Sequence, residues 1–207
     1  DDEILGLGGT LLKHVSNGDK VFVHILTDGH SSRKESTRKL KNAVNKRKSC
    51  AEIVADKMGF SGLYTSDSFD QKLDTVPLIK IVHEIENYSS NVNPDYVYTH
   101  HYGDVNFDHK IVFEASINAF RPAGNQFPKR IFSFETFSSN EWGLPVDKNV
   151  FKPNYFVDIS KFLSKKLEII SYYKQELKEY PHPRSLKGIK VSACKWGTYI
   201  HTEAAEA

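Results

Sequence analysis

The sequence predicts an α/β fold in three layers, with a mostly parallel sheet between helices on both faces. Short runs of β-branched and aromatic residues alternate along the chain with stretches that carry apolar residues at helical spacing. The length of 207 residues, of which 39% are hydrophobic, suits one domain with a full core. Because strands that alternate with helices form a parallel sheet, we expect a single Rossmann-like domain over 1–207.

In the first half of the chain, predicted helices and strands follow one another in turn. Apolar residues at helical spacing predict a first helix over 4–15, and the turn Asn17-Gly18-Asp19 ends it. The next elements are a strand over 20–27, a long helix with a basic outer face over 38–58 that Gly59 ends, a short strand over 63–65, a helix over 76–88 and a strand over 96–99.

The second half continues this pattern as far as residue 178. It contains a predicted helix over 108–120, strands over 131–134 and 155–159, and a helix over 160–178 that Ser160 would cap. The last stretch, 180–207, holds Pro181, Pro183 and Gly188. We therefore expect an irregular lobe there, packed against the sheet.

Composition excludes several classes of protein. The net charge is only +2, so we expect no nucleic-acid partner held by electrostatics. No apolar run approaches the roughly 20 residues that a membrane-spanning helix needs. Two cysteines, Cys50 and Cys194, cannot form a disulfide framework. We expect a cytoplasmic protein, unless a signal precedes residue 1.

Ionisable residues gather in segments that should lie at the ends of strands. Asp1-Asp2-Glu3 stands just ahead of the first helix, and the stretch 99–109 directly follows the strand over 96–99. Loops that follow parallel strands share one edge of the sheet, so these two segments are expected to meet there. A third segment, 180–185, holds His182 and Arg184.

Each segment also has a purely structural interpretation. Acidic residues at a helix start complement the helix dipole, which contributes about 0.3–1 kcal/mol. His109 can be an ordinary buried histidine with satisfied nitrogens, and His182 between two prolines fits a rigid turn. His100 and His101 point to opposite faces if the chain is extended there, so at most one of them should face a common site.

Taken together, an aspartate and a histidine from separate segments, with a second carboxylate beside the aspartate, are what a hydrolytic zinc site needs. Zinc binds nitrogen and oxygen ligands and keeps one position for water. The ion lowers the pKa of that water to about 7, and an adjacent carboxylate can take its proton. Two ligands are one short of the usual three, so the third must come from elsewhere in the chain or from upstream of it.

These residues resemble a known family. Asp1-Asp2-Glu3, the strand end Thr27-Asp28-Gly29, Arg47, and Pro94 to His100 before Asn106-Phe107-Asp108-His109 are similar to motifs of the LmbE-like, or PIG-L, family of zinc-dependent N-acetylglucosaminyl deacetylases. The stretch 181–185 also resembles a C-terminal signature of part of this family. The resemblance implies an amidohydrolase that removes the N-acetyl group from an N-acetylglucosamine-type amino sugar or its conjugate.

Carried over residue by residue, the resemblance implies one Zn²⁺ ion, or another divalent metal, bound by Asp2 and His109, with Asp1 as the general base. The family's other ligand, a histidine two positions before the first aspartate, would lie upstream of residue 1. Since residue 1 is Asp rather than Met, we expect an N-terminal strand and this ligand to be missing from the sequence. Asp108 matches a family carboxylate that orients neighbouring groups.

The sequence departs from the family at the position of Asn106, where many relatives have a histidine that assists the transition state or the leaving amine. An amide cannot donate a proton as an acid, but it can hydrogen-bond a developing oxyanion. We therefore expect Asp1 or a nearby histidine, such as His101, to protonate the departing amine.

Four residues are candidates for binding the substrate. Tyr102 and Trp142 are possible aromatic platforms for a sugar, although for Trp142 the role of a partly buried packing residue is favoured. Arg47 and Arg184 could hold a phosphate or carboxylate of the attached group. The basic stretch over 33–48 fits a solvated helix face, or an anionic substrate. The sequence identifies neither the sugar, nor the group attached to it, nor the oligomeric state.

Two other functions stay open. Gly6-Leu7-Gly8-Gly9 looks suited to phosphate, as in a dinucleotide-binding domain, but Leu11 occupies the last glycine position of the Gly-x-Gly-x-x-Gly pattern. A metal-binding or sugar-binding protein without turnover is the second alternative, because of Asn106 and the unseen histidine.

Overall fold

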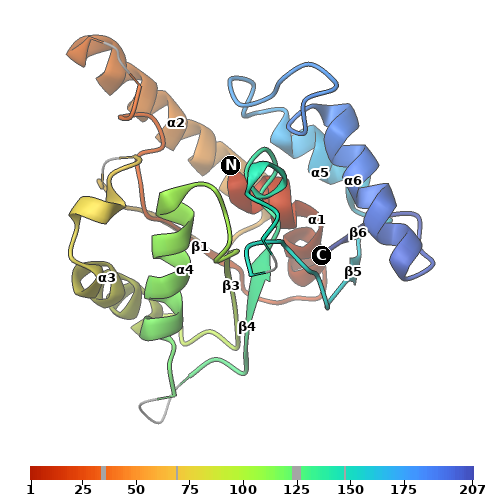
Figure 1. Ribbon diagram of the computed structural model, residues 1–207, viewed down its shortest axis with the longest axis horizontal. Helices are drawn as coiled ribbons and strands as arrows, with labels where there is room; N and C mark the ends of the chain where they lie inside the picture. The colour runs from red at the N-terminus through yellow and green to blue at the C-terminus, as the bar shows by residue number, and fades with distance from the viewer. Residues whose placement is uncertain (34–35, 69, 123–126, 147) are drawn as a thin grey trace.

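The structure, a computed structural model, describes residues 1–33, 36–68, 70–122, 127–146 and 148–207. Its elements alternate much as predicted (Figure 1). In chain order they are α1 (Asp2–Ser16), β1 (Phe22–Ile25), α2 (Thr37–Met58), β2 (Gly62–Thr65), η1 (Leu73–Thr75), α3 (Leu78–Ser90), β3 (Tyr96–His100), α4 (Phe107–Ala119), β4 (Arg130–Phe134), η2 (Asn140–Trp142), β5 (Val157–Asp158), α5 (Leu163–Ile170), α6 (Leu186–Tyr199) and β6 (Ala205–Glu206).

The strands pair two by two. β1 runs parallel to β2, with Phe22 opposite Gly62, and β3 runs parallel to β4, with Tyr96 opposite Arg130. β5 and β6 form a short antiparallel pair. Among the described strands, β1 and β3 do not pair with each other. A cavity of about 1050 Å³ lies between them, and α1 contributes Leu7 and Leu11 to its lining.

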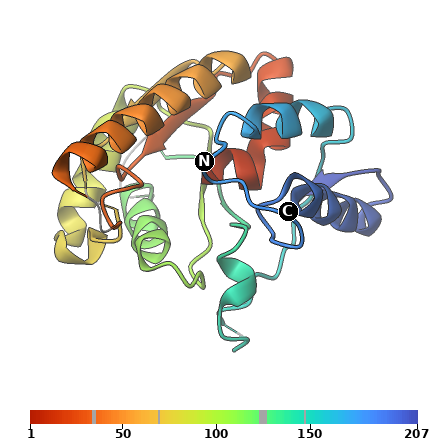
Figure 2. The same cartoon turned by 90° about the horizontal axis from the view of Figure 1, so that it is seen from above.

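The helix α1 organises the core. Figures 1 and 2 show it near the middle of the molecule, with α3 and α4 on one side and α5 and α6 on the other. Ile4 and Leu5 of α1 are fully buried and share one apolar cluster with Val54 of α2 and Ile170 of α5. A second cluster lies between α3 and α4. Among the described helices, none has both the length and the hydropathy that crossing a bilayer requires.

The glycines of α1 serve packing inside a helix. A Cβ atom at Gly9 would lie 2.7 Å from side-chain atoms of Ile159, and one at Gly6 would lie 2.6 Å from the carbonyl oxygen of Glu135. Gly6, Gly8 and Gly9 are all buried within the helix and form no phosphate-binding loop. The structure therefore gives the dinucleotide-binding alternative no support.

A buried ion pair fastens the C-terminal strand to α1. Lys166 is only 1% exposed, and its Nζ donates hydrogen bonds to Glu206 Oε1 and to the carbonyl oxygen of Leu5, both at 2.6 Å. The Glu206 carboxylate also accepts hydrogen bonds from the backbone N–H groups of Gly9 at 2.8 Å and Thr10 at 2.7 Å. The ammonium group and both carboxylate oxygens thus have hydrogen-bond partners.

Two predictions about the second half are wrong. The helix predicted over 160–178 is reduced to α5, which begins after Phe162, because Ser160 instead donates to the Asp158 side chain. The stretch over 180–207 is not irregular, since it contains α6, capped by Ser185. Gly188 lies inside that helix, at a point where a Cβ atom would lie 2.7 Å from the carbonyl oxygen of Pro183.

Candidate metal centre

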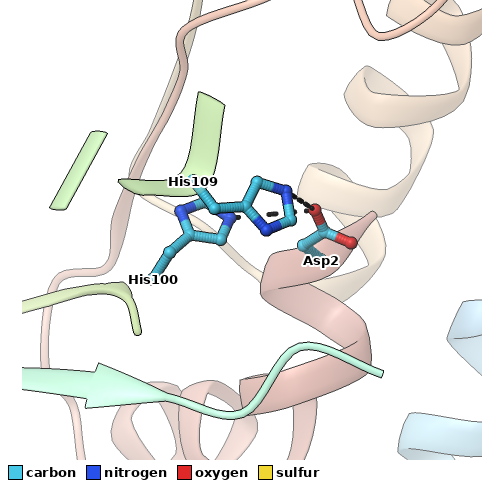
Figure 3. Close-up of side chains that lie close together, drawn as sticks. All are labelled: Asp2, His100 and His109. Carbon is cyan, nitrogen blue, oxygen red and sulfur yellow. Dashed lines mark ion pairs between the residues drawn. The ribbon is translucent and has the colours of Figure 1, made fainter. Parts of the chain in front are cut away.

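Three side chains meet at the carboxyl end of β3. Asp2 comes from the first turn of α1, His100 from the end of β3, and His109 from the first turn of α4 (Figure 3). His109 Nε2 lies 3.2 Å and His100 Nε2 lies 3.7 Å from Asp2 Oδ2. The two imidazole rings stack with their centroids 4.1 Å apart, and one ligand atom from each residue lies within 4.8 Å of the others.

Local structure explains how the chain reaches this arrangement. β3 ends at His100, and the chain turns back into α4 within a few residues. Asn106 begins α4 because its side-chain oxygen accepts a hydrogen bond from the Asp108 N–H at 3.0 Å, as N-cap residues do. His109 is therefore placed in the first helical turn, over the strand end that carries His100.

Burial and charge shape the protonation of this cluster. Burial lowers the pKa of His100, and the neighbouring His109 lowers it further. Burial also opposes a charge on His109, but hydrogen bonds to Asp104 and Asp2 outweigh it and raise its pKa to about 9. Although burial alone would raise the pKa of Asp2, the facing imidazoles and Arg184 hold it well below its usual value.

The donor set fits a divalent metal of the zinc type. Both ring nitrogens of His100 are buried, and neither has a hydrogen-bond partner. Buried polar groups in proteins are normally paired, so an imidazole in this state indicates a ligand that it can bind. Two imidazole nitrogens and one carboxylate oxygen are donors that zinc prefers. Asp2, His100 and His109 are the residues that would hold the ion.

Asp1, the predicted general base, lies beside this cluster in different surroundings. Its side chain is buried, with Arg47 Nη2 hydrogen-bonded to Oδ1 and Arg184 Nη1 donating to Oδ2 at 3.1 Å. Arg184 Nη2 also reaches Asp2 Oδ1 at 3.2 Å. The two adjacent carboxylates therefore face different partners, since Asp2 faces imidazoles and Asp1 faces guanidinium groups.

The two arginines predicted to bind substrate are engaged with carboxylates. Besides Asp1, both contact Glu176, with Arg47 Nη1 at 2.6 Å from Oε1 and Arg184 Nη1 at 3.6 Å from Oε2. Burial would raise the pKa of Glu176, but Arg47, Arg33 and Arg184 together lower it. No sequence signal identified Glu176, because an acidic residue on a predicted helix is usually a surface residue.

The remaining predicted catalytic residues lie at different distances from the cluster. Asn106 lines it, with Nδ2 3.0 Å from His109 Nε2. Asp108 turns away and accepts hydrogen bonds from the backbone N–H groups of Gln71 and Leu73. His101 also turns away, since its Nε2 lies 3.1 Å from the carbonyl oxygen of Asn149. Of the neighbouring histidines, His100 thus faces the cluster and His101 does not.

The predicted aromatic platforms are on the surface. Trp142 is 58% exposed, and its ring stands perpendicular to that of His182 at a centroid distance of 5.5 Å. Tyr102 is 47% exposed and contacts the rings of His101 and Phe113. Next to Tyr102, the backbone packs so tightly that a Cβ atom at Gly103 would lie 2.3 Å from the carbonyl oxygen of Asn149.

Sequence reasoning also missed Asp104. This residue is completely buried, and its Oδ2 lies 3.0 Å from His109 Nδ1, the ring nitrogen on the side away from Asp2. Burial would raise its pKa, but His109 and the hydrogen bonds from Ser139 and Asn106 lower it. The available signal was its place five residues before His109, on the same loop.

Several solved structures share this fold. An N,N'-diacetylchitobiose deacetylase from Pyrococcus horikoshii matches with a TM-score of 0.78 and 19% identity, over 100% of this chain and 78% of that one. The conserved protein TT1542 from Thermus thermophilus matches with a TM-score of 0.76 and 21% identity, over 100% of this chain and 88% of that one. GalB, the 4-carboxy-2-hydroxymuconate hydratase from Pseudomonas putida, matches with a TM-score of 0.73 and 16% identity, over 100% of this chain and 90% of that one. These likenesses confirm the predicted α/β fold.

The family is shown by sequence. A family model described as GlcNAc-PI de-N-acetylase, PIG-L, matches residues 1–120. That match covers more than half of the 207 residues and includes all three side chains of the candidate metal centre. The predicted resemblance is thereby confirmed, and the chain belongs to the PIG-L family.

Proposed function

We propose that this protein is a metal-dependent amidohydrolase that removes the N-acetyl group from an N-acetylglucosamine-type sugar or its conjugate. The observation that carries the proposal is the ligand set of Asp2, His100 and His109 with a second carboxylate, Asp1, directly beside it. The family is that of GlcNAc-PI de-N-acetylases, and the Pyrococcus horikoshii neighbour is an N,N'-diacetylchitobiose deacetylase, which supports this proposal.

Asp2, His100 and His109 would hold the metal. When bound, zinc supplies a Lewis acid for the acetyl carbonyl and lowers the pKa of water to about 7. Other divalent ions that accept nitrogen and oxygen ligands fit the same donors.

The protein's own residues perform the proton transfers in this proposal. Asp1 accepts the proton of the attacking water, and Arg47 and Arg184 hold its carboxylate in place from two sides. Asp1 then returns the proton to the departing amine, because His101 is turned toward Asn149. The amide of Asn106 lines the cluster and donates to the oxyanion that forms on the acetyl group.

We expect the sugar to lie against Tyr102 or Trp142, both of which are exposed. Arg47 and Arg184 are neutralised by Asp1 and Glu176, so we expect them to orient the base rather than to bind an anion on the substrate. Asp108 keeps the role of fixing the loop over 71–73 beside the site.

We also propose that a strand preceding Asp1 fills the cavity between β1 and β3 and brings a further histidine ligand. The cavity is bordered on both sides by strands that already pair in parallel with an outer neighbour, and Asp1 lies at its edge. One added strand would join the two pairs into a single sheet. Replacing that histidine by alanine in the full-length protein should weaken zinc binding.

The proposed activity is tested by measuring zinc content and acetate release from N,N'-diacetylchitobiose with the full-length protein. We expect bound zinc, acetate release that a chelator abolishes, and recovery when zinc is restored. Asp1→Asn should lower kcat by a factor of about 10²–10⁴ while zinc content stays normal, because general-base catalysis contributes that much. Zinc without acetate release would indicate a binding protein, and near-normal turnover of Asp1→Asn would overturn the base assignment.

A further inference from the structure

Asp104 connects two segments that are far apart in the sequence. Its carboxylate Oδ2 lies 3.0 Å from His109 Nδ1 and accepts a hydrogen bond from Asn140 Nδ2 at 2.9 Å. Its Oδ1 accepts hydrogen bonds from the N–H of Asn106 at 2.8 Å and from the hydroxyl of Ser139. Both oxygens are thus fully engaged, and the side chain has no exposure to solvent.

The contact with His109 determines which ring nitrogen is free. A neutral imidazole carries one proton, and a carboxylate at Nδ1 keeps the proton on that nitrogen. The lone pair then remains on Nε2, which is the nitrogen that faces Asp2 at 3.2 Å. Without the carboxylate, His109 could place its proton on Nε2 or rotate, and in either case it would bind a metal less well.

The contacts with Ser139 and Asn140 fix the loop that carries Trp142. Asn140 and Trp142 belong to the same short helix, η2. The Asn140 side chain also accepts a hydrogen bond from the N–H of Thr136 at 2.6 Å, so Asn140 links Asp104 to the chain that leads into η2. The same buried carboxylate therefore orients a metal ligand and the segment that bears the exposed tryptophan.

We propose that Asp104 is a positioning residue, which fixes His109 for the metal and also holds the Ser139–Trp142 segment, which bears a proposed sugar platform. The proposal rests on the metal centre of the proposed function. Beyond that function, the geometry of the His109 ligand and the position of Trp142 both depend on the Asp104 side chain.

The test compares Asp104→Asn with the unaltered full-length protein. We expect zinc affinity, measured by competition with a chromophoric chelator, to fall by about 10–100-fold, as for other residues that orient a ligand histidine. The visible absorption spectrum of the Co²⁺-substituted protein should change, because the geometry at His109 changes. Ile170→Val is the matched control, since it removes a buried methyl group from the core and should leave zinc affinity unaltered.

Ser139→Ala tests the link between Asp104 and the Trp142 segment. It also keeps the proposal testable if Asp104→Asn fails to fold. It removes one hydrogen bond to Asp104 and leaves the contact with His109 in place. We expect zinc affinity within about threefold of normal and a raised KM for the sugar with kcat retained.

Unchanged zinc affinity and Co²⁺ spectrum in Asp104→Asn would overturn the positioning role even if the protein releases acetate. A lowered affinity in a protein that releases no acetate would support the positioning role and contradict the deacetylase proposal. A full-length protein that binds no zinc would overturn both. A Ser139→Ala variant with unchanged KM would remove the link to the Trp142 segment.

Discussion

Two buried groups of charges contact α1, and they differ in how completely they are satisfied. In the first group, Lys166 and Glu206 bind each other and also the backbone of α1, so each charged group has partners. In the second group, Asp2 faces His100 and His109, and neither nitrogen of His100 has a hydrogen-bond partner. Both groups are built from side chains that are costly to bury.

The difference separates a structural role from a functional one. A fully paired network stabilises one fold, because each group in it would lose its partners on unfolding or rearrangement. A buried imidazole without hydrogen bonds is unfavourable until a ligand binds it, so the second group favours the ligand-bound state. The comparison predicts that changes to the first group will alter stability and that changes to the second will alter metal binding.

The largest expected effect on stability is that of Lys166→Met. This change leaves the buried Glu206 carboxylate without its cation, which typically costs about 3–5 kcal/mol of unfolding free energy. Urea denaturation should show this loss, while zinc affinity at the other group stays normal. The double variant Lys166→Met/Glu206→Gln should recover most of the stability. A loss below about 1 kcal/mol, as exposed ion pairs give, would break the comparison.

A smaller effect is expected from pH in the metal-free protein. The pKa of His109 is raised from its ordinary 6.5 to about 9, because hydrogen bonds to Asp104 and Asp2 outweigh burial. A raised pKa stabilises the fold below the unfolded value, so stability should fall as pH rises from about 6.5 to about 9. The total loss is on the order of 3 kcal/mol. Urea denaturation in chelator at several pH values measures it.

His109→Gln is the control for this pH dependence, because glutamine does not titrate in that range. Its unfolding free energy should be nearly constant between those pH values. If the unfolding free energy of His109→Gln still falls with pH, another group is responsible for the pH dependence. The role given to His109 in the second charge group would then be wrong.

The smallest change in stability is expected for His100→Leu in the metal-free protein. Leucine removes two buried nitrogens that have no hydrogen-bond partner, and an unsatisfied buried group costs about 1–3 kcal/mol. We therefore expect the unfolding free energy to stay constant or rise by about 1 kcal/mol, while zinc binding is largely lost. Destabilisation as large as that of Lys166→Met would contradict the comparison.

Much of the fold could be predicted from sequence, because apolar residues recur along its strands and helices at the spacing typical of each. Asp2 and His109 could be placed together because both lie where a parallel sheet gathers its loops. His100 could not be distinguished from His101, since both follow the same strand and alternation alone does not determine which side chain faces α1. Their assignment needed the backbone of β3 and α4.

The hydrogen-bonded partners of the site were beyond sequence reasoning for a different reason. Glu176 acts through Arg47 and Arg184, which come from α2 and from the segment before α6. Such contacts depend on how distant segments pack, and no local pattern records them. The helix α6 was missed because two prolines and Gly188 resemble loop signals, although the Ser185 cap marks a helix start.

The tight packing at Gly103 has a mechanical consequence. The peptide of Asn149 rests where any other residue would carry its first side-chain carbon. A single methyl group at this position would have to displace the backbone of Asn149, although it would touch none of the three candidate metal ligands. Gly103 therefore lets the loop that leads from β3 into α4, and so to His109, lie directly against the backbone of Asn149.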